Sequence, residues 1–124
     1  MERWLGRFSE PIYVLFRVVL GFLMACHGAQ KLFGALGGPK ANTPLMTFAG
    51  PVEFVGGLFV ALGVFAGIAA FFVSGTMAVA YFMAHAPKGL WPIKNGGELA
   101  VAYCFAFLYI AARGTGRYGL IRSK

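Results

Sequence analysis

Apolar residues form three long runs in this sequence, and the middle run is too long for one membrane helix. The runs cover residues 12–30, 54–84 and 99–112. The middle run has 31 residues without a charge, which as one helix would extend about 46 Å against a bilayer core of ~30 Å. Two shorter helices joined near Gly63 and Gly67 fit better, because glycine accepts the backbone conformations found at helix ends. The pattern predicts four helices, at about residues 12–30, 50–64, 67–84 and 98–112.

Composition places these helices in a lipid bilayer. Hydrophobic residues make up 59% of the 124-residue chain and charged residues 12%, whereas soluble domains carry about 25% charged residues. The last run would extend about 21 Å, so it can span a bilayer only if Glu98 and Arg113 lie at the two interfaces. We expect residues 1–124 to form a single domain, an all-α integral membrane four-helix bundle.

The charged residues indicate how this bundle is oriented. The net charge is +7, and the basic residues lie in short segments between the apolar runs. This distribution is typical of membrane loops and not of a nucleic-acid-binding surface. With four spans, the side of the termini carries six basic residues and the opposite side four. The six are Arg3, Arg7, Arg113, Arg117, Arg122 and Lys124, and the four are Lys31, Lys40, Lys88 and Lys94. The positive-inside rule predicts that both termini are cytoplasmic.

Two further expectations concern the cytoplasmic side. Arg17 lies about 8 Å inside the first helix, close enough for its long side chain to reach the interface. Residues 113–124 are basic, so we expect them to follow the membrane surface or to fray.

Polar side chains gather at the predicted outer end of all four helices. An ionisable group at membrane depth costs free energy unless it is paired or hydrated, so it marks a candidate site. Glu53 is the strongest case, because it lies in the first turn of the second helix. The candidate catalytic residues are Glu53, His85 and His27, and the candidate cofactor-binding residues are Lys31, Gln30, Tyr81, Asn95, Glu98 and Trp91.

Simpler interpretations of these residues stay open. Glu53 and Lys31 could only hold the bundle together as an ion pair, and the histidines could only form interfacial hydrogen bonds. Two histidines and a glutamate match a zinc or iron ligand set, but no HxxxH or ExxH spacing supports one, and nothing marks a haem slot. We therefore expect no metal and no haem. Cys26 and Cys104 lie at similar predicted depth and could form a redox-active pair.

Four blocks of sequence surround the candidate residues. They are residues 27–34 (HGAQKLFG), 53–57 (EFVGG), 80–92 (AYFMAHAPKGLWP) and 95–100 (NGGELA), with Tyr103, Cys104 and Phe105 following. In this order they resemble the DoxX family of small four-helix membrane proteins, over about residues 17–118. The resemblance implies a multi-pass protein of the bacterial inner membrane, linked to quinone-dependent oxidation of sulfur compounds or to thiol and oxidative stress. It also implies soluble or membrane redox enzymes as partners, without an agreed role for the matched residues.

The leading hypothesis from the sequence is a membrane subunit that binds a quinone or a similar lipophilic carrier near the outer leaflet. His85 or His27 would hydrogen-bond the carrier, Glu53 would exchange protons, and the positive charge of Lys31 would favour the ionised carboxylate. One alternative is a non-catalytic scaffold whose basic residues 113–124 hold partner enzymes. Another is a small enzyme, such as an isomerase, that acts on a lipophilic substrate. The sequence also leaves a homo-oligomer open.

Overall fold

The computed structural model describes residues 1–37 and 41–121. Lys40, Arg122 and Lys124, which enter the charge comparison, lie outside the described residues. The described chain is helical, which confirms the all-α prediction, and its one β-type contact is an isolated bridge between Val64 and Ile121. The elements are α1 (Glu2–Leu5), η1 (Gly6–Phe8), α2 (Ser9–Phe33), η2 (Ala35–Gly37), α3 (Pro44–Leu62), α4 (Ala66–Ala80), η3 (Tyr81–His85), η4 (Ala86–Lys88), α5 (Pro92–Asn95) and α6 (Glu98–Arg113).

The second helix begins earlier than the sequence pattern indicates. The expected start was near Gly50, but α3 begins at Pro44. The side chain of Thr43 accepts a hydrogen bond of 3.1 Å from the Met46 backbone N–H, and proline follows at the first helical position. Both features favour a helix start. The end of α3 lies where expected, at Gly63, whose φ of 74° is left-handed.

Three helical stretches of the described chain are long and apolar enough to cross a membrane. They are Glu2–Phe33, Pro44–Leu62 and Ala66–Lys88. The expectation of a fourth full-length span is not supported, because α6 has only 16 residues. Its length is fixed by Gly97, which precedes it, and Gly114, which follows it, so it extends about 24 Å.

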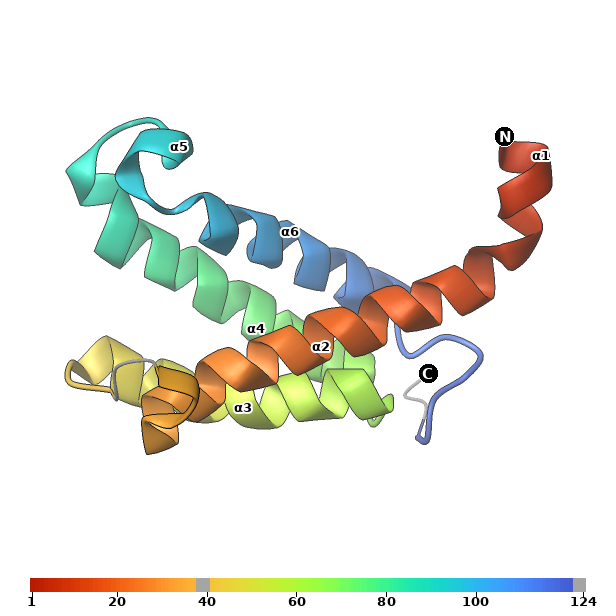
Figure 1. The fold of residues 1–124 in the computed structure, drawn as a ribbon, viewed down its shortest axis with the longest axis horizontal. Coiled ribbons are helices and arrows are strands. Elements are labelled where there is room, and N and C mark those ends of the chain that lie inside the picture. The colour runs from red at the N-terminus through yellow and green to blue at the C-terminus, as the bar shows by residue number, and fades with distance from the viewer. Residues whose placement is uncertain (38–40, 122–124) are drawn as a thin grey trace.

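The four long helices form two closely packed pairs. α2 packs against α3, α4 packs against α6, and the two pairs are joined where α3 meets α4. The helices run back and forth, so both termini lie at the same end of the molecule (Figure 1). α2 and α6 make few backbone contacts in the described chain and meet through aromatic side chains, such as Tyr13 with Tyr109 and His27 with Tyr103. The bundle is therefore loosest between α2 and α6.

Glycine residues bring α2 and α3 into backbone contact. A Cβ atom on Gly57 would lie 2.5 Å from the backbone nitrogen of Ala25, and a Cβ on Gly21 would lie 2.6 Å from the Gly57 carbonyl oxygen. A Cβ on Gly28 would lie 2.2 Å from the Phe54 nitrogen. None of these contacts leaves room for a side chain. Small residues of this kind allow membrane helices to approach closely.

The expectation that Arg17 reaches the interface was wrong, and residues 114–121 do not fray. Arg17 is 2% exposed, and its guanidinium donates hydrogen bonds to the carbonyls of Thr115 (2.5 Å) and Tyr118 (3.1 Å). The segment from Gly114 to Ile121 folds back over the α3–α4 turn, where the Ile121 N–H donates to the Gly63 carbonyl at 2.9 Å. The carbonyls that bind the guanidinium belong to this segment, and such hydrogen bonds favour a buried positive charge.

The glycine contacts lead to a first prediction. Gly57→Ala places a Cβ into the backbone of α2, so we expect it to lower the free energy of unfolding by about 1–3 kcal/mol. Gly75→Ala is the matched control, because Gly75 lies in α4 and a Cβ atom added there would meet nothing within 4 Å. The control should be neutral or stabilising by up to ~1 kcal/mol. Unfolding in detergent micelles measures both, and equal effects would contradict the close-packing argument.

Candidate functional site

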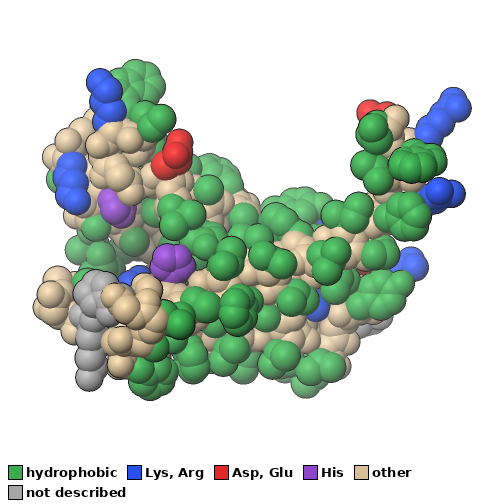
Figure 2. Space-filling model, in the orientation of Figure 1, with side chains coloured by type: hydrophobic (Ala, Val, Ile, Leu, Met, Phe, Trp, Pro, Cys, Tyr) green, Lys and Arg blue, Asp and Glu red, His purple; other side chains and the backbone are tan. Residues whose placement is uncertain are grey.

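A cavity of about 260 Å³ lies between the two helix pairs, at the end of the molecule away from the termini (Figure 1). All four long helices or their extensions contribute to it. Its lining residues are Met24, His27, Lys31, Glu53, Met77, Ala80, His85, Gly96, Leu99, Ala100 and Tyr103. Figure 2 shows the two histidines of the chain on either side of a hollow at this end. Most of the lining is apolar, so the few polar groups are conspicuous.

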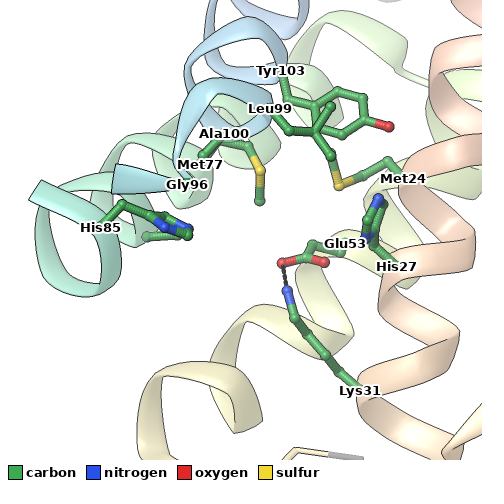
Figure 3. Close-up of a pocket in the computed structure, with 11 residues that line it drawn as sticks. Met24, His27, Lys31, Glu53, Met77, His85, Gly96, Leu99, Ala100 and Tyr103 are labelled. Atoms are coloured by element: carbon green, nitrogen blue, oxygen red, sulfur yellow. Dashed lines mark hydrogen bonds and ion pairs between the residues drawn. The ribbon is translucent and has the colours of Figure 1, made fainter. Parts of the chain in front are cut away.

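An ion pair between α2 and α3 forms one side of the cavity. Lys31 Nζ lies 2.5 Å from Glu53 Oε2 (Figure 3), as the sequence argument expected for these two residues. The side chain of Glu53 is 1% exposed and that of Lys31 is 23% exposed. The close approach of the two helices positions the pair, since Lys31 follows Gly28 by less than one turn and Glu53 precedes Gly57 by about one turn.

The second carboxylate oxygen of Glu53 has no partner. Oε1 is buried and accepts no hydrogen bond from the described residues. A buried acceptor without a donor costs roughly 1–3 kcal/mol, and more when it is charged. Oε1 therefore still lacks a hydrogen-bond donor, and a group bound in the adjacent cavity could supply one.

The two histidines lie on opposite walls of the cavity (Figure 3). His27 comes from α2 and meets the edge of the Tyr103 ring, with the ring centroids 5.7 Å apart. His85 is the last residue of η3, a π-helical turn that continues α4, and its Nδ1 lies 3.4 Å from the Asn95 carbonyl oxygen. The extra residue in a π-turn rotates the following side chains by about 100° relative to a regular α-helix. The π-turn therefore helps to set the direction of the His85 side chain.

Tyr81 and Asn95 hold the connection between α4 and α6 and do not line the cavity. Asn95 is buried, and its Nδ2 donates to Tyr81 Oη at 3.0 Å and to the Gly89 carbonyl at 3.1 Å. Its Oδ1 accepts from the Gly97 N–H at 2.8 Å. A Cβ on Gly97 would lie 2.7 Å from both Tyr81 and His85. These contacts fix the wall that carries His85.

The remaining sequence candidates lie outside the cavity lining. Gln30 donates a long hydrogen bond of 3.5 Å to the Leu36 carbonyl, in the loop that follows α2. Glu98 is exposed in the first turn of α6, and Trp91 is exposed in the loop before α5. The sequence indicated that the three residues lie at a similar depth, but none of them lines the cavity.

Met24, Met77 and Tyr103 line the cavity but were not among the sequence candidates. Both methionines lie on helix faces shared with other lining residues: Met24 is two turns before Lys31, and Met77 is two turns before His85. This helical periodicity is the sequence pattern that could have identified the two methionines. The pattern for Tyr103 is weaker, because it lies one turn after Leu99 on a helix where most residues are apolar.

Neither cysteine is paired, and both are free thiols. Ser74 Oγ donates to the Cys104 carbonyl at 2.7 Å and lies 3.6 Å from its sulfur. Within residues 1–37 and 41–121, no group of three His, Cys, Asp or Glu side chains is close enough to hold a metal ion.

Comparison with known proteins assigns the family. The sequence profile of the DoxX family matches residues 12–86, which include α2, α3, α4 and the ion pair. The chain belongs to the DoxX family. An uncharacterized protein of Haemophilus influenzae is 40% identical, with 90% of each chain covered. No solved structure matches the sequence. With the apolar helices, the family makes this chain a membrane protein in contact with lipid.

The ion pair generates a second prediction. Lys31→Met leaves a buried carboxylate without its cation, so the free energy of unfolding should fall by about 3 kcal/mol, the low end for a buried pair, because Lys31 is partly exposed. Lys31→Met combined with Glu53→Gln removes the uncompensated charge and should recover most of this loss. Denaturant unfolding of the two variants beside wild type tests the pairing. A double variant as unstable as the single one would contradict it.

Proposed function

We propose that this DoxX-family protein binds a lipophilic redox carrier, such as a quinone, in the cavity, as the membrane subunit of a quinone-linked redox or thiol and oxidative-stress system. The observation that carries the proposal is the buried Lys31–Glu53 pair with one unpartnered carboxylate oxygen, facing two histidines across a mainly apolar cavity. Ionisable groups inside a membrane protein mark functional sites. A soluble or membrane redox enzyme would be the partner.

The dimensions and chemistry of the cavity fit the head group of such a carrier. Its volume of about 260 Å³ is just below the ~300 Å³ at which pockets for drug-sized ligands begin. It can therefore take a ring but not a long apolar tail, which would lie in the bilayer. The apolar lining from Met24, Met77 and Leu99 suits a ring, and the polar groups at its edge suit ring oxygens.

Each polar group then has a distinct role. An N–H of His27 or His85 donates to a ring oxygen, and their positions on opposite walls suit the two oxygens of a quinone. Glu53 exchanges protons at the nearer oxygen, while Lys31 stabilises its ionised form. Met24 and Tyr103 exclude water from the pair. A bound quinone would supply a group that takes up and releases electrons together with protons, which no side chain here does.

The charge distribution supports a site near the outer leaflet. The cavity lies at the end away from both termini, and the basic residues favour cytoplasmic termini by the positive-inside rule. We propose the bacterial inner membrane as the location. The carrier would then enter from the outer half of the bilayer.

Glu53→Gln is the third prediction, and Glu98→Gln is its matched control. Only the reduced carrier, the quinol, has a hydroxyl that can donate to the Glu53 carboxylate, and hydrogen bonds to a charged group are worth about 1.5–3 kcal/mol. Glu53→Gln should therefore lower quinol retention roughly tenfold or more, as measured by native mass spectrometry of the protein extracted with its lipids under reducing conditions. Glu98 is an exposed carboxylate outside the cavity, and its variant should retain quinol like wild type.

Two results would overturn the proposal. One is wild-type protein that retains no quinone after gentle extraction. The other is a Glu53→Gln variant that retains quinol and supports turnover of its partner complex as wild type does. If deletion of residues 113–124 instead abolishes recovery of the complex while Glu53→Gln has no effect, the scaffold hypothesis replaces this one.

A further inference from the structure

The loop between η4 and α5, together with α5, exposes large apolar side chains that no part of the described chain covers. Leu90 is 81% exposed, Trp91 61% and Ile93 76%. This segment projects from the cavity end of the molecule as a short arm beside α5 (Figure 1). Lys88 and Lys94 flank them and are also exposed. The arm, defined as residues 87–94, carries no acidic residue, and Glu98 on α6 is the next one along the chain.

The position of the arm limits the environment that it can occupy. The third apolar stretch ends at Lys88, so the arm begins where that helix leaves the hydrocarbon core. Water would leave the three apolar side chains exposed, and the hydrocarbon core would leave two ammonium groups without water or a counter-ion. The headgroup layer suits both, because Trp favours it and lysine can extend to its charged surface.

We propose that residues 87–94 insert into a headgroup layer that contains anionic lipid, and that Asn95 couples this insertion to the His85 wall of the cavity. The two lysines supply the attraction for anionic lipid, at about 1 kcal/mol or roughly fivefold each. Asn95 supplies the connection, because it bonds Gly89 in the arm and Tyr81 beside the cavity wall, and its carbonyl lies near His85. Lipid composition thereby affects the geometry of the cavity, whether or not the ligand is a quinone.

The arm can be tested with its own fluorophore. The chain has two tryptophans, so Trp4→Phe leaves Trp91 as the sole reporter. The protein is reconstituted in phosphatidylcholine vesicles with or without phosphatidylglycerol, and the quenchers are lipids brominated near the headgroup or near the chain ends. We expect stronger quenching by the shallow bromines, and a further increase when phosphatidylglycerol is added.

Charge-matched variants separate the arm from the rest of the protein. In the Trp4→Phe background, Lys88→Gln with Lys94→Gln should abolish most of the increase caused by phosphatidylglycerol, because each lysine contributes roughly fivefold to the attraction for anionic lipid. Arg3→Gln with Arg7→Gln removes two basic residues from the opposite end and should leave the response unchanged. Quenching of Trp91 by aqueous iodide but not by brominated lipid would overturn the insertion. A response independent of phosphatidylglycerol would overturn the preference for anionic lipid.

The coupling has a separate readout. Hydrogen exchange of residues 81–85 should slow when phosphatidylglycerol is added to the wild-type protein and to Asn42→Ala, an exposed asparagine in another loop. Asn95→Ala should lose this slowing, and the milder Tyr81→Phe, which removes only the Oη acceptor, should lose part of it. In both variants Trp91 should still be quenched by the shallow bromines. If exchange still slows in Asn95→Ala, the coupling is wrong even though the insertion stands.

Discussion

Backbone contact between α2 and α3 is the constraint on which the rest of the structure depends. Gly21, Gly28 and Gly57 leave no room for a Cβ atom, so the two helices approach more closely than side chains would allow. This approach brings Lys31 within hydrogen-bond distance of Glu53. Without a hydrophobic driving force between helices in lipid, close packing and polar contacts must hold them together. The same contact therefore stabilises the fold and assembles the charged side of the cavity.

The second helix pair, α4 and α6, leaves a space beside α2 that forms the cavity. α6 packs on α4 and makes few backbone contacts with α2, so aromatic side chains such as Tyr103 bridge a gap that backbone does not fill. The connection between α4 and α6 then supplies His85, fixed by Asn95 and by the close approach of Gly97. The tight packing of α2 on α3 and the loose contact between α2 and α6 together explain why a cavity exists at this end of a small bundle.

At the opposite end of the molecule, the buried guanidinium of Arg17 holds the segment after α6 against the bundle. Arg17 has no carboxylate partner among the described residues, and its two terminal nitrogens donate to the carbonyls of Thr115 and Tyr118. The Thr115 hydroxyl accepts the Ala66 N–H at the start of α4. The salt bridge of Glu10 with Arg113 adds a further tie between α2 and the end of α6. Two basic residues, Arg17 and Arg113, thus hold this end of the bundle together.

The sequence by itself determined the all-α class, the membrane environment, the α3–α4 turn at Gly63 and the depth shared by Lys31, Glu53 and the histidines, because helix periodicity and hydrophobic length are local properties of the chain. It missed the start of α3, which depends on capping by Thr43, and the burial of Arg17, whose carbonyl partners lie about a hundred residues away. It also could not separate the cavity-lining His85 from Tyr81, Asn95 and Trp91. Only the tertiary structure decided which of these face one another, because that depends on helix rotation and on the spacing between helices, which no local pattern encodes.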